Sequence, residues 1–256
     1  MAIQIASIDG GGSFDFGKTA RQYAKYRDIY PPEMYERLGA LGVGAAGTKW
    51  LDLGTGTGVL PLNLFTHGAE ITGVDISAEQ IEAAKLLAAE RGAPIRFLAC
   101  PAETLPFADG TFDAVTAAQC FWYFDRAKIV PEIRRVLKSG GVFVKVYMTY
   151  LLTDPIARRS YDLVKRLNPA WTPGASGYRD VYRHPFPNGQ VDVFTSDIPF
   201  TRESWHGRML ACRGTMASMD DETLRVWDER HRKILAKQPE AFTVRHKIYI
   251  ASYIVK

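Results

Sequence analysis

This 256-residue chain contains three alternating glycines with an acidic residue on either side, and residues of these types at this spacing could bind a ligand. Gly54, Gly56 and Gly58 follow a short apolar stretch, and without side chains they leave backbone N–H groups open to a ligand. Asp52 precedes the glycines, and Asp75 stands about 20 residues beyond the loop, where a βαβ unit presents a carboxylate to ribose hydroxyls. The pattern predicts a nucleoside-binding site, although a plain turn between a strand and a helix would also use such a loop.

The position of the third glycine separates two classes of cofactor. A dinucleotide fingerprint requires a glycine where this chain has Val59, and it has no use for the acid at Asp52. The pattern Asp-x-Gly-x-Gly-x-Gly instead resembles motif I of the class I S-adenosylmethionine (SAM) dependent methyltransferases, in particular the small-molecule, type 11/25-like group. The resemblance covers residues 15–150 well and the rest loosely. It continues in order through 73–77, 102–107, 111–113 and 137–141.

Strand-like and helix-like segments alternate around the loop, and this alternation predicts a parallel sheet with helices on both faces. The strands are expected at 50–53, 70–75, 95–99, 112–118, 142–147, 191–200 and 242–254. The helices are expected at 15–28, 31–38, 60–66, 78–91, 126–137, 155–167, 201–212 and 220–237. Ser77 is expected to cap one helix, and Gly140 and Gly141 to close another. The resemblance implies a Rossmann-like three-layer α/β sandwich, with a mostly parallel seven-stranded sheet and one antiparallel strand.

The chain is long enough for one large domain. Residues 1–14 are predicted to be a flexible tail, and residues 15–256 a single domain. Its expected parts are N-terminal cap helices at 15–45, a SAM-binding core at 46–150, a lid insertion at 151–190, and C-terminal helices with hairpin strands at 191–256.

Charge and cysteine content restrict the class of protein. The net charge of +4 is spread among interleaved basic and acidic residues, which is too mild to argue for a nucleic-acid partner. The three cysteines form no close pair, so neither a disulfide framework nor a zinc site is expected. No signal peptide or membrane-spanning stretch is recognisable. A cytoplasmic monomer or homodimer without a membrane partner or a bound metal is therefore expected.

By resemblance, the cofactor is SAM and the product is S-adenosylhomocysteine. The residues that the resemblance assigns to cofactor binding are Tyr23, Tyr26, Arg27, Asp52, Gly54, Thr55, Gly56, Gly58, Asp75, Ile76, Ala102, Glu103 and Gln119. The glycines would pass under the aminocarboxypropyl chain, Asp52 would accept from the amino group, Asp75 would bind the ribose, and Ile76 would pack on the adenine. Pro101 replaces an acid that many relatives carry, so the adenine amino contact falls to Ala102 or Glu103.

The segment that contains Tyr23, Tyr26 and Arg27 resembles a cap helix over the methionine end of SAM. An amphipathic helix packed on the sheet is the alternative.

The residues expected to bind the methyl acceptor are Trp122, Tyr123, Tyr147, Arg202, Trp205 and Arg208. The aromatic rings after the fourth strand would lie near the sulfonium or pack in the core. The arginines would suit an acceptor that carries a carboxylate, or they form a salt-bridged exposed face. His184, His206 and Tyr147 are the candidates for a general base, and the sequence does not choose among them.

Methyl transfer from a sulfonium is an in-line displacement, so alignment and exclusion of water can supply much of the rate. We therefore expect an enzyme that methylates an O, N, S or C atom of a small-molecule metabolite. The alternatives are an RNA or protein methyltransferase, a non-catalytic SAM-binding module, an aminopropyl transferase and, least favoured because of Val59, a nicotinamide oxidoreductase. The Asn-Pro-Pro-Tyr type of motif used by nucleic-acid and protein amino methylases is absent after the fourth strand.

Overall fold

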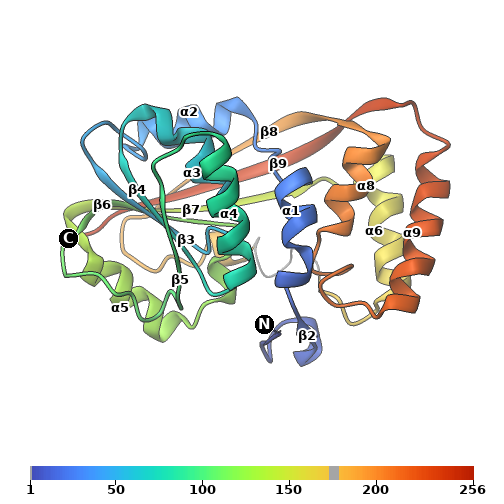
Figure 1. Cartoon of the computed structure of the whole chain (residues 1–256), viewed down its shortest axis with the longest axis horizontal. Helices are drawn as coiled ribbons and strands as arrows, with labels where there is room; N and C mark the ends of the chain where they lie inside the picture. The colour runs from blue at the N-terminus through green and yellow to red at the C-terminus, as the bar shows by residue number, and fades with distance from the viewer. Residues whose placement is uncertain (1, 173–178) are drawn as a thin grey trace. The chain divides into compact units, whose positions relative to one another are not determined.

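The computed structural model describes residues 2–172 and 179–256. The chain divides into two compact units (Figure 1). Unit 1 consists of Met1–Ile29, Met148–Ser176 and Thr195–Lys247, and unit 2 of Tyr30–Tyr147, Gly177–Phe194 and Ile248–Lys256. The prediction of one domain with a lid insertion stays a prediction.

Seven strands of the described chain form one sheet, in the order β5-β4-β3-β6-β7-β9-β8. Their bounds are β3 Lys49–Leu53, β4 Glu70–Asp75, β5 Arg96–Ala99, β6 Phe112–Ala118, β7 Leu137–Tyr150, β8 Gln190–Thr201 and β9 Ala241–Ile254. The pairings β5 with β4, β4 with β3, β3 with β6, and β6 with β7 are parallel. The sheet is mostly parallel with one antiparallel strand and helices around it, so the predicted fold class is confirmed.

Unit 2 holds the glycine loop and the parallel strands. Its helices are α2 Pro32–Ala40, α3 Val59–Leu64, α4 Ala78–Glu90 and α5 Arg126–Val136. The Ser77 hydroxyl accepts from the Gln80 N–H at the start of α4, which confirms the predicted cap. Leu51, Val115 and Phe143 are fully buried, because a parallel strand covered on both faces is apolar along its length.

The predicted closure of the fifth helix by two glycines is wrong, although its predicted last residue, 137, lies within one residue of the observed end. Gly140 and Gly141 do not close it, because α5 ends at Val136 and β7 begins at once with the extended Leu137. Leu137 pairs with Phe112, and the next pair is Val142 with Ala114. Residues 138–141, for which the sequence pattern predicted a turn, are the extra residues of this irregular register.

Unit 1 contains the helices α1 Ala20–Tyr26, α6 Pro155–Leu167, α8 Arg202–Leu210 and α9 Asp221–Leu235. Helix α6 packs on α9, and α8 packs on both α1 and α9. Gly207 allows the close approach of α1, because a Cβ there would lie 2.2 Å from the Tyr26 ring. Thr201 and Ser204 form a capping box at the start of α8.

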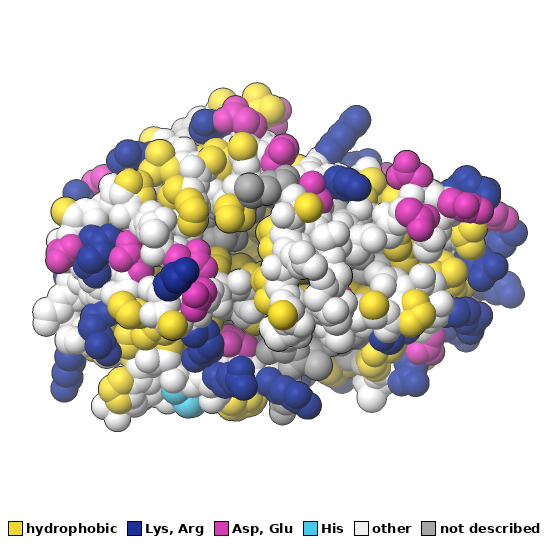
Figure 2. All heavy atoms as spheres, turned by 90° about the horizontal axis from the view of Figure 1, so that it is seen from below, with side chains coloured by type: hydrophobic (Ala, Val, Ile, Leu, Met, Phe, Trp, Pro, Cys, Tyr) yellow, Lys and Arg dark blue, Asp and Glu magenta, His cyan; other side chains and the backbone are white. Residues whose placement is uncertain are grey.

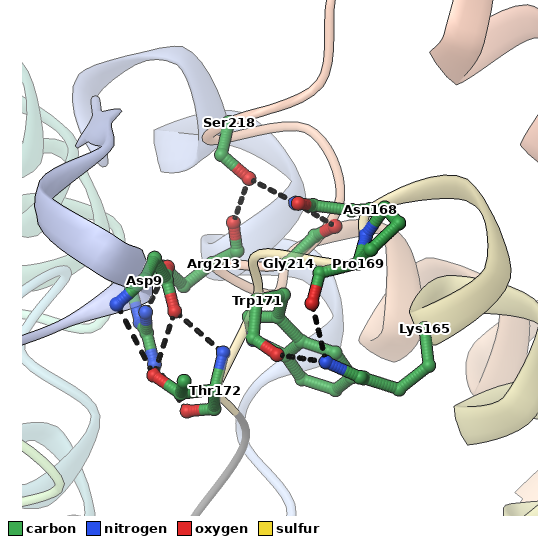
Figure 3. Close-up of polar contacts among 9 residues, drawn as sticks. All are labelled: Asp9, Lys165, Asn168, Pro169, Trp171, Thr172, Arg213, Gly214 and Ser218. Carbon is green, nitrogen blue, oxygen red and sulfur yellow. Dashed lines mark hydrogen bonds and ion pairs between the residues drawn. The ribbon is translucent and has the colours of Figure 1, made fainter.

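The first residues are not the flexible tail that the sequence predicts. They form the short strands β1 Ile3–Gln4 and β2 Ser13–Phe14, and between them Asp9 is buried. Figure 3 shows Asp9 in an ion pair with Arg213, also buried, while the N–H and hydroxyl of Thr172 donate to the Asp9 carboxylate over 2.6 and 2.9 Å. These partners lie far along the chain, so no local sequence pattern could indicate them.

Candidate cofactor site at the glycine loop

The glycine loop needs its glycines for both backbone conformation and packing. Gly54, Gly56 and Gly58 have φ values of 58°, 58° and 78°, the left-handed region that glycine adopts without a steric penalty. A Cβ on Gly54 would lie 2.8 Å from the Cys120 side chain, and one on Gly58 would lie 2.8 Å from the Phe97 ring. The loop therefore packs tightly against its neighbours, and residues with side chains would not fit at Gly54 or Gly58.

Asp75 fixes the loop from the end of β4. The Gly56 N–H donates to Asp75 Oδ2 over 2.9 Å, and the Ser77 N–H donates to Oδ1 over 2.9 Å. Burial of the carboxyl group raises the pKa of Asp75, and these backbone donors oppose the rise. The carboxylate is thus held at the tip of the strand, beside the loop, as the sequence pattern predicts for a ribose-binding acid.

Asp52 is bound by hydroxyl groups of its own chain. It is 2% exposed, and its two carboxylate oxygens accept from Thr55 Oγ1 over 2.7 Å and Thr116 Oγ1 over 2.6 Å. The Trp50 indole N–H donates in turn to Thr116 Oγ1 over 2.8 Å. Burial raises the pKa of Asp52 to about 7, the two hydroxyl donors oppose the rise, and the negative charge of Asp75 adds to it.

Thr116 and Trp50 are members of this network that sequence reasoning missed. Thr116 pairs directly with Asp52 in the register of β3 and β6. The signal in the sequence that could have identified Thr116 was its place in a mostly apolar strand. Asp52 therefore serves the packing of the sheet, and its contact with a cofactor amino group stays a prediction.

The side chains next to this network fit a nucleoside. Ile76 follows Asp75 and is 47% exposed, although apolar. Within the described chain, the Thr57 hydroxyl is fully buried and has no hydrogen-bond partner. Ala102 is buried, and Glu103 is half-buried, with its carboxylate accepting from the Asp125 N–H over 3.0 Å. A strand-tip acid, an exposed apolar side chain and an orphaned hydroxyl around a tight loop are consistent with the adenosine part of SAM.

Gln119 and the aromatic residues lie just beyond the end of β6. Gln119 has a φ of 61°, an uncommon conformation for a residue other than glycine and one that concentrates at functional sites. The Trp122 ring packs edge-on against Tyr147 and tilts over Tyr123, with ring centroids 5.3 Å apart in both pairs. Tyr147 is buried and also packs on Tyr249. The structure therefore brings these three predicted acceptor residues together.

His184 does not fit the role of a base at the glycine loop. It is exposed, and its Nδ1 lies 3.1 Å from the Tyr253 hydroxyl. Tyr253 is close in sequence to Val255, which exchanges backbone hydrogen bonds with Gly140 and Gly141 near the start of β7. The glycine loop follows the opposite, carboxyl end of the parallel strands.

His206 belongs to unit 1 and is also committed to structure. It is 3% exposed, with Nε2 2.8 Å from Asp228 Oδ1 and Nδ1 2.8 Å from Nδ1 of His231. His231 Nε2 lies 2.9 Å from Ser160 Oγ, which also accepts from the Trp205 indole N–H over 2.9 Å. Burial lowers the pKa of both histidines. Neither His206 nor the fully buried Trp205 presents a free face to an acceptor.

The two predicted arginines of α8 differ. Arg202 is half-buried, donates to the Gln238 carbonyl over 2.9 Å and forms an ion pair with Glu240 at 3.6 Å, which is the salt-bridged alternative. Arg208 is 4% exposed and lies over the rings of Tyr150 and Trp205.

The cap-helix residues also lie in unit 1. The Tyr26 hydroxyl donates to Glu203 over 2.7 Å, and the Arg27 guanidinium lies 5.0 Å from the centre of the Tyr23 ring. These contacts are those of an amphipathic helix packed on α8, and the placement of the three residues over a cofactor stays a prediction.

The described residues contain neither a candidate metal cluster nor a helix that could span a membrane. No group of three or more His, Cys, Asp and Glu side chains there could hold a metal ion. No helix within 2–172 and 179–256 has the length and apolar character needed to cross a bilayer.

Comparison with known proteins agrees with this geometry. Residues 51–145, from the strand before the glycine loop to β7, match the family described as Methyltransferase domain. This stretch is a class I methyltransferase domain. Its resemblance to that family, noted from the order of its motifs, is confirmed.

Relatives of the methyltransferase domain cover only part of the chain. An uncharacterized methyltransferase of Bacillus subtilis is 37% identical over 160 residues, which are 60% of this chain and 62% of the relative. A demethylmenaquinone methyltransferase of Thermus thermophilus is 44% identical over 107 residues, 41% of this chain and 49% of the relative. The chain spans about half the length of the curated relatives it matches.

The fold extends over more of the chain than the sequence similarity does. A solved structure from Anaeromyxobacter dehalogenans, described as a candidate type II methyltransferase, superposes with a TM-score of 0.61. That superposition covers 89% of this chain and 97% of the other at 23% identity. The methyltransferase fold is therefore shared beyond residues 51–145.

Proposed function

We propose that this protein is a SAM-dependent methyltransferase that acts on a small-molecule acceptor. The observation that carries the proposal is the glycine loop held by Asp75 through the Gly56 N–H, in a domain of the methyltransferase family. Asp75 and Ile76 would hold the ribose and the adenine, and the loop backbone and Thr57 would face the rest of the cofactor.

When bound, SAM would supply a methyl group already activated by the sulfonium charge. The part left to this chain is to orient the reactants and to exclude water. The unusual backbone at Gln119 and the ring cluster of Trp122, Tyr123 and Tyr147 would form a rigid apolar wall for that purpose. A cation over an aromatic face gains about 0.5 to 2 kcal/mol, so such rings would also tolerate the sulfonium.

A small-molecule acceptor is supported by a relative and by the surface. The Thermus relative is named for demethylmenaquinone, which is a small molecule. On the face shown in Figure 2, Lys and Arg side chains are interspersed with Asp and Glu. A methyltransferase acting on RNA is expected to carry a more continuous basic surface.

The test is calorimetric titration of the full chain with SAM and with S-adenosylhomocysteine, using Asp75→Asn. Loss of a charge-assisted hydrogen bond worth about 1.5 to 3 kcal/mol should weaken SAM binding by about tenfold or more. Asp109→Asn is the matched control, because Asp109 is exposed and bonded to Arg135, and its affinity should equal that of the unchanged protein.

A turnover screen over pools of small metabolites would then identify the acceptor. Equal SAM affinity in Asp75→Asn and the unchanged protein would remove Asp75 from the site. Tight binding of NAD(H) without binding of either sulfur ligand would reject the function.

A further inference from the structure

Arg208 is a buried arginine that lacks an oxygen acceptor within the described part of unit 1. It is 4% exposed, and its Nε is buried without a hydrogen-bond partner in the described chain. The Nη1 group lies near two sulfur atoms only, 3.5 Å from Met209 Sδ and 3.1 Å from Cys212 Sγ. Sulfur is a weak acceptor, so the guanidinium donors are poorly satisfied.

No carboxylate compensates the charge of Arg208 in the described chain. The ionisable groups with the largest effect on its pKa are Cys212, Arg27, Tyr150 and Tyr23, and burial is the main reason that this pKa is lowered. The residues that the structure does not describe, Met1 and 173–178, include no Asp or Glu. An acidic side chain cannot come from them.

The aromatic neighbours do not replace an anion. The Arg208 guanidinium lies 4.8 Å from the centre of the Tyr150 ring and 5.4 Å from that of Trp205. A cation over an aromatic face recovers less free energy than removal of a charge from water costs. Arg27 adds a second positive charge near the first, which makes an anion more favourable still.

Arg213 is a second buried arginine of unit 1, and it has an acidic partner. Its guanidinium forms an ion pair with Asp9 and donates to the Thr172 carbonyl over 2.9 Å (Figure 3). Arg208 is buried to a similar extent and lacks any such partner within the described residues. The contrast indicates that no described residue of the chain is the partner of Arg208.

We propose that unit 1 contains an anion-binding site centred on Arg208, and that it takes the carboxylate of a small apolar or aromatic ligand. The planar guanidinium fork matches a carboxylate in two-bond geometry. The rings of Tyr150 and Trp205 pack against the guanidinium and hold its plane, and the half-buried Tyr23 ring beside them supplies apolar surface for the body of the ligand. Tyr23 and Arg27 are only half-buried, so this group of side chains reaches the surface. That the carboxylate belongs to the methyl acceptor rests on the proposed function, whereas the binding site itself does not.

The test is titration of the full chain with benzoate at constant ionic strength and without SAM, followed by the ¹H–¹⁵N signals of arginine Nε groups. Benzoate should bind with a dissociation constant of about 1 mM or tighter and shift the Arg208 Nε signal. Arg208→Met should weaken binding by about tenfold or more while leaving the fold intact, because the variant no longer buries a charge. Arg208→Lys should restore part of the affinity, since it restores the charge without the fork.

Arg158→Met is the matched control, because Arg158 lies on α6 in the same unit, exposed and paired with Asp162. It should bind benzoate as the unchanged protein does. Benzamide, which has the same shape without the charge, should bind at least tenfold more weakly than benzoate.

The proposal is overturned if the unchanged protein does not bind benzoate, if benzamide binds equally well, or if Arg208→Met keeps full affinity. Binding of inorganic phosphate alone would overturn the assignment to a carboxylate. Because SAM is absent from this experiment, failure of the proposed function would leave its result unchanged. Methyl transfer that is unaffected in Arg208→Met would separate the site from the acceptor.

Discussion

Two buried charged side chains, Arg213 in unit 1 and Asp52 in unit 2, are accommodated by different means. Arg213 meets an opposite charge, Asp9. Asp52 meets only the neutral hydroxyls of Thr55 and Thr116. Burial raises the pKa of Asp52 to about 7, and the two hydroxyl donors oppose this rise without cancelling it. The comparison teaches that burial alone does not fix the charge of a group, because the nature of its partners does.

The largest expected effect comes from breaking the Asp9–Arg213 pair. Asp9→Asn keeps the shape of the side chain but removes the negative charge that faces the buried Arg213, so the free energy of unfolding should fall by about 3 to 5 kcal/mol. Urea denaturation with a probe in unit 1 measures it. Asp162→Asn breaks an exposed ion pair with Arg158 and should cost at most about 0.5 kcal/mol. If the two variants cost the same, the Asp9–Arg213 pair is not the buried anchor described above.

A change of pH should change the stability of the two units in opposite directions. The pKa values of His206 and His231 are lowered by burial, so the unfolded chain binds more protons below about pH 6.5 and unit 1 loses stability as the pH falls. The pKa of Asp52 is raised, so the folded state binds the extra proton between about pH 4 and 7, and unit 2 gains stability as the pH falls.

Each of these groups contributes up to about 1.4 kcal/mol per pH unit. Native-state hydrogen exchange at pH 7 and pH 5, corrected for the intrinsic exchange rates, would resolve α8 and α9 from β3 and β6. Protection should fall in the helices relative to the strands. A uniform change across both regions would contradict the comparison.

The smallest effect is expected at Thr116. Thr116→Val removes the hydroxyl that donates to Asp52 and accepts from the Trp50 indole, at nearly constant volume. Unfolding free energy should fall by about 1 to 3 kcal/mol, because a buried donor and a buried acceptor each lose a partner. The pKa of Asp52 should rise further, and the carbonyl stretch of a protonated carboxylic acid in the infrared spectrum would report it. Thr111→Val is the control, since its hydroxyl bonds to the Ala108 carbonyl at an exposed turn. An unchanged titration of Asp52 would show that the hydroxyl does not stabilise its charge.

The elements around the glycine loop were predictable because their signals are local. The Ser77 cap, the strand 112–118 and the helix 155–167 each agree with the structure, since capping, apolar runs and helical periodicity act within a few residues. The predicted helix closure at Gly140 and Gly141 was wrong for the opposite reason. There, pairing of Leu137 with a strand distant in sequence overrode the local turn signal.

The candidate site was predictable only in part. The order of the motifs determined the family and directed attention to Asp75, whose bond to the Gly56 N–H follows from neighbouring strands ending at one edge of the sheet. The sequence could not indicate which partners His184, His206 and Trp205 would bond to. Each depends on partners far along the chain, namely Tyr253, His231 and Ser160.

The sequence by itself determined the fold class, the glycine loop and the acids at its edge, because strand order and loop conformation are encoded by residue types at short range. Only the tertiary structure decided which buried charges have partners. It brought Asp9 to Arg213 and Thr116 to Asp52, and it placed no acidic side chain of the described chain against Arg208. The physical reason is that burial and charge compensation depend on which distant segments pack together, and a charge pattern read along one strand or helix does not contain that information.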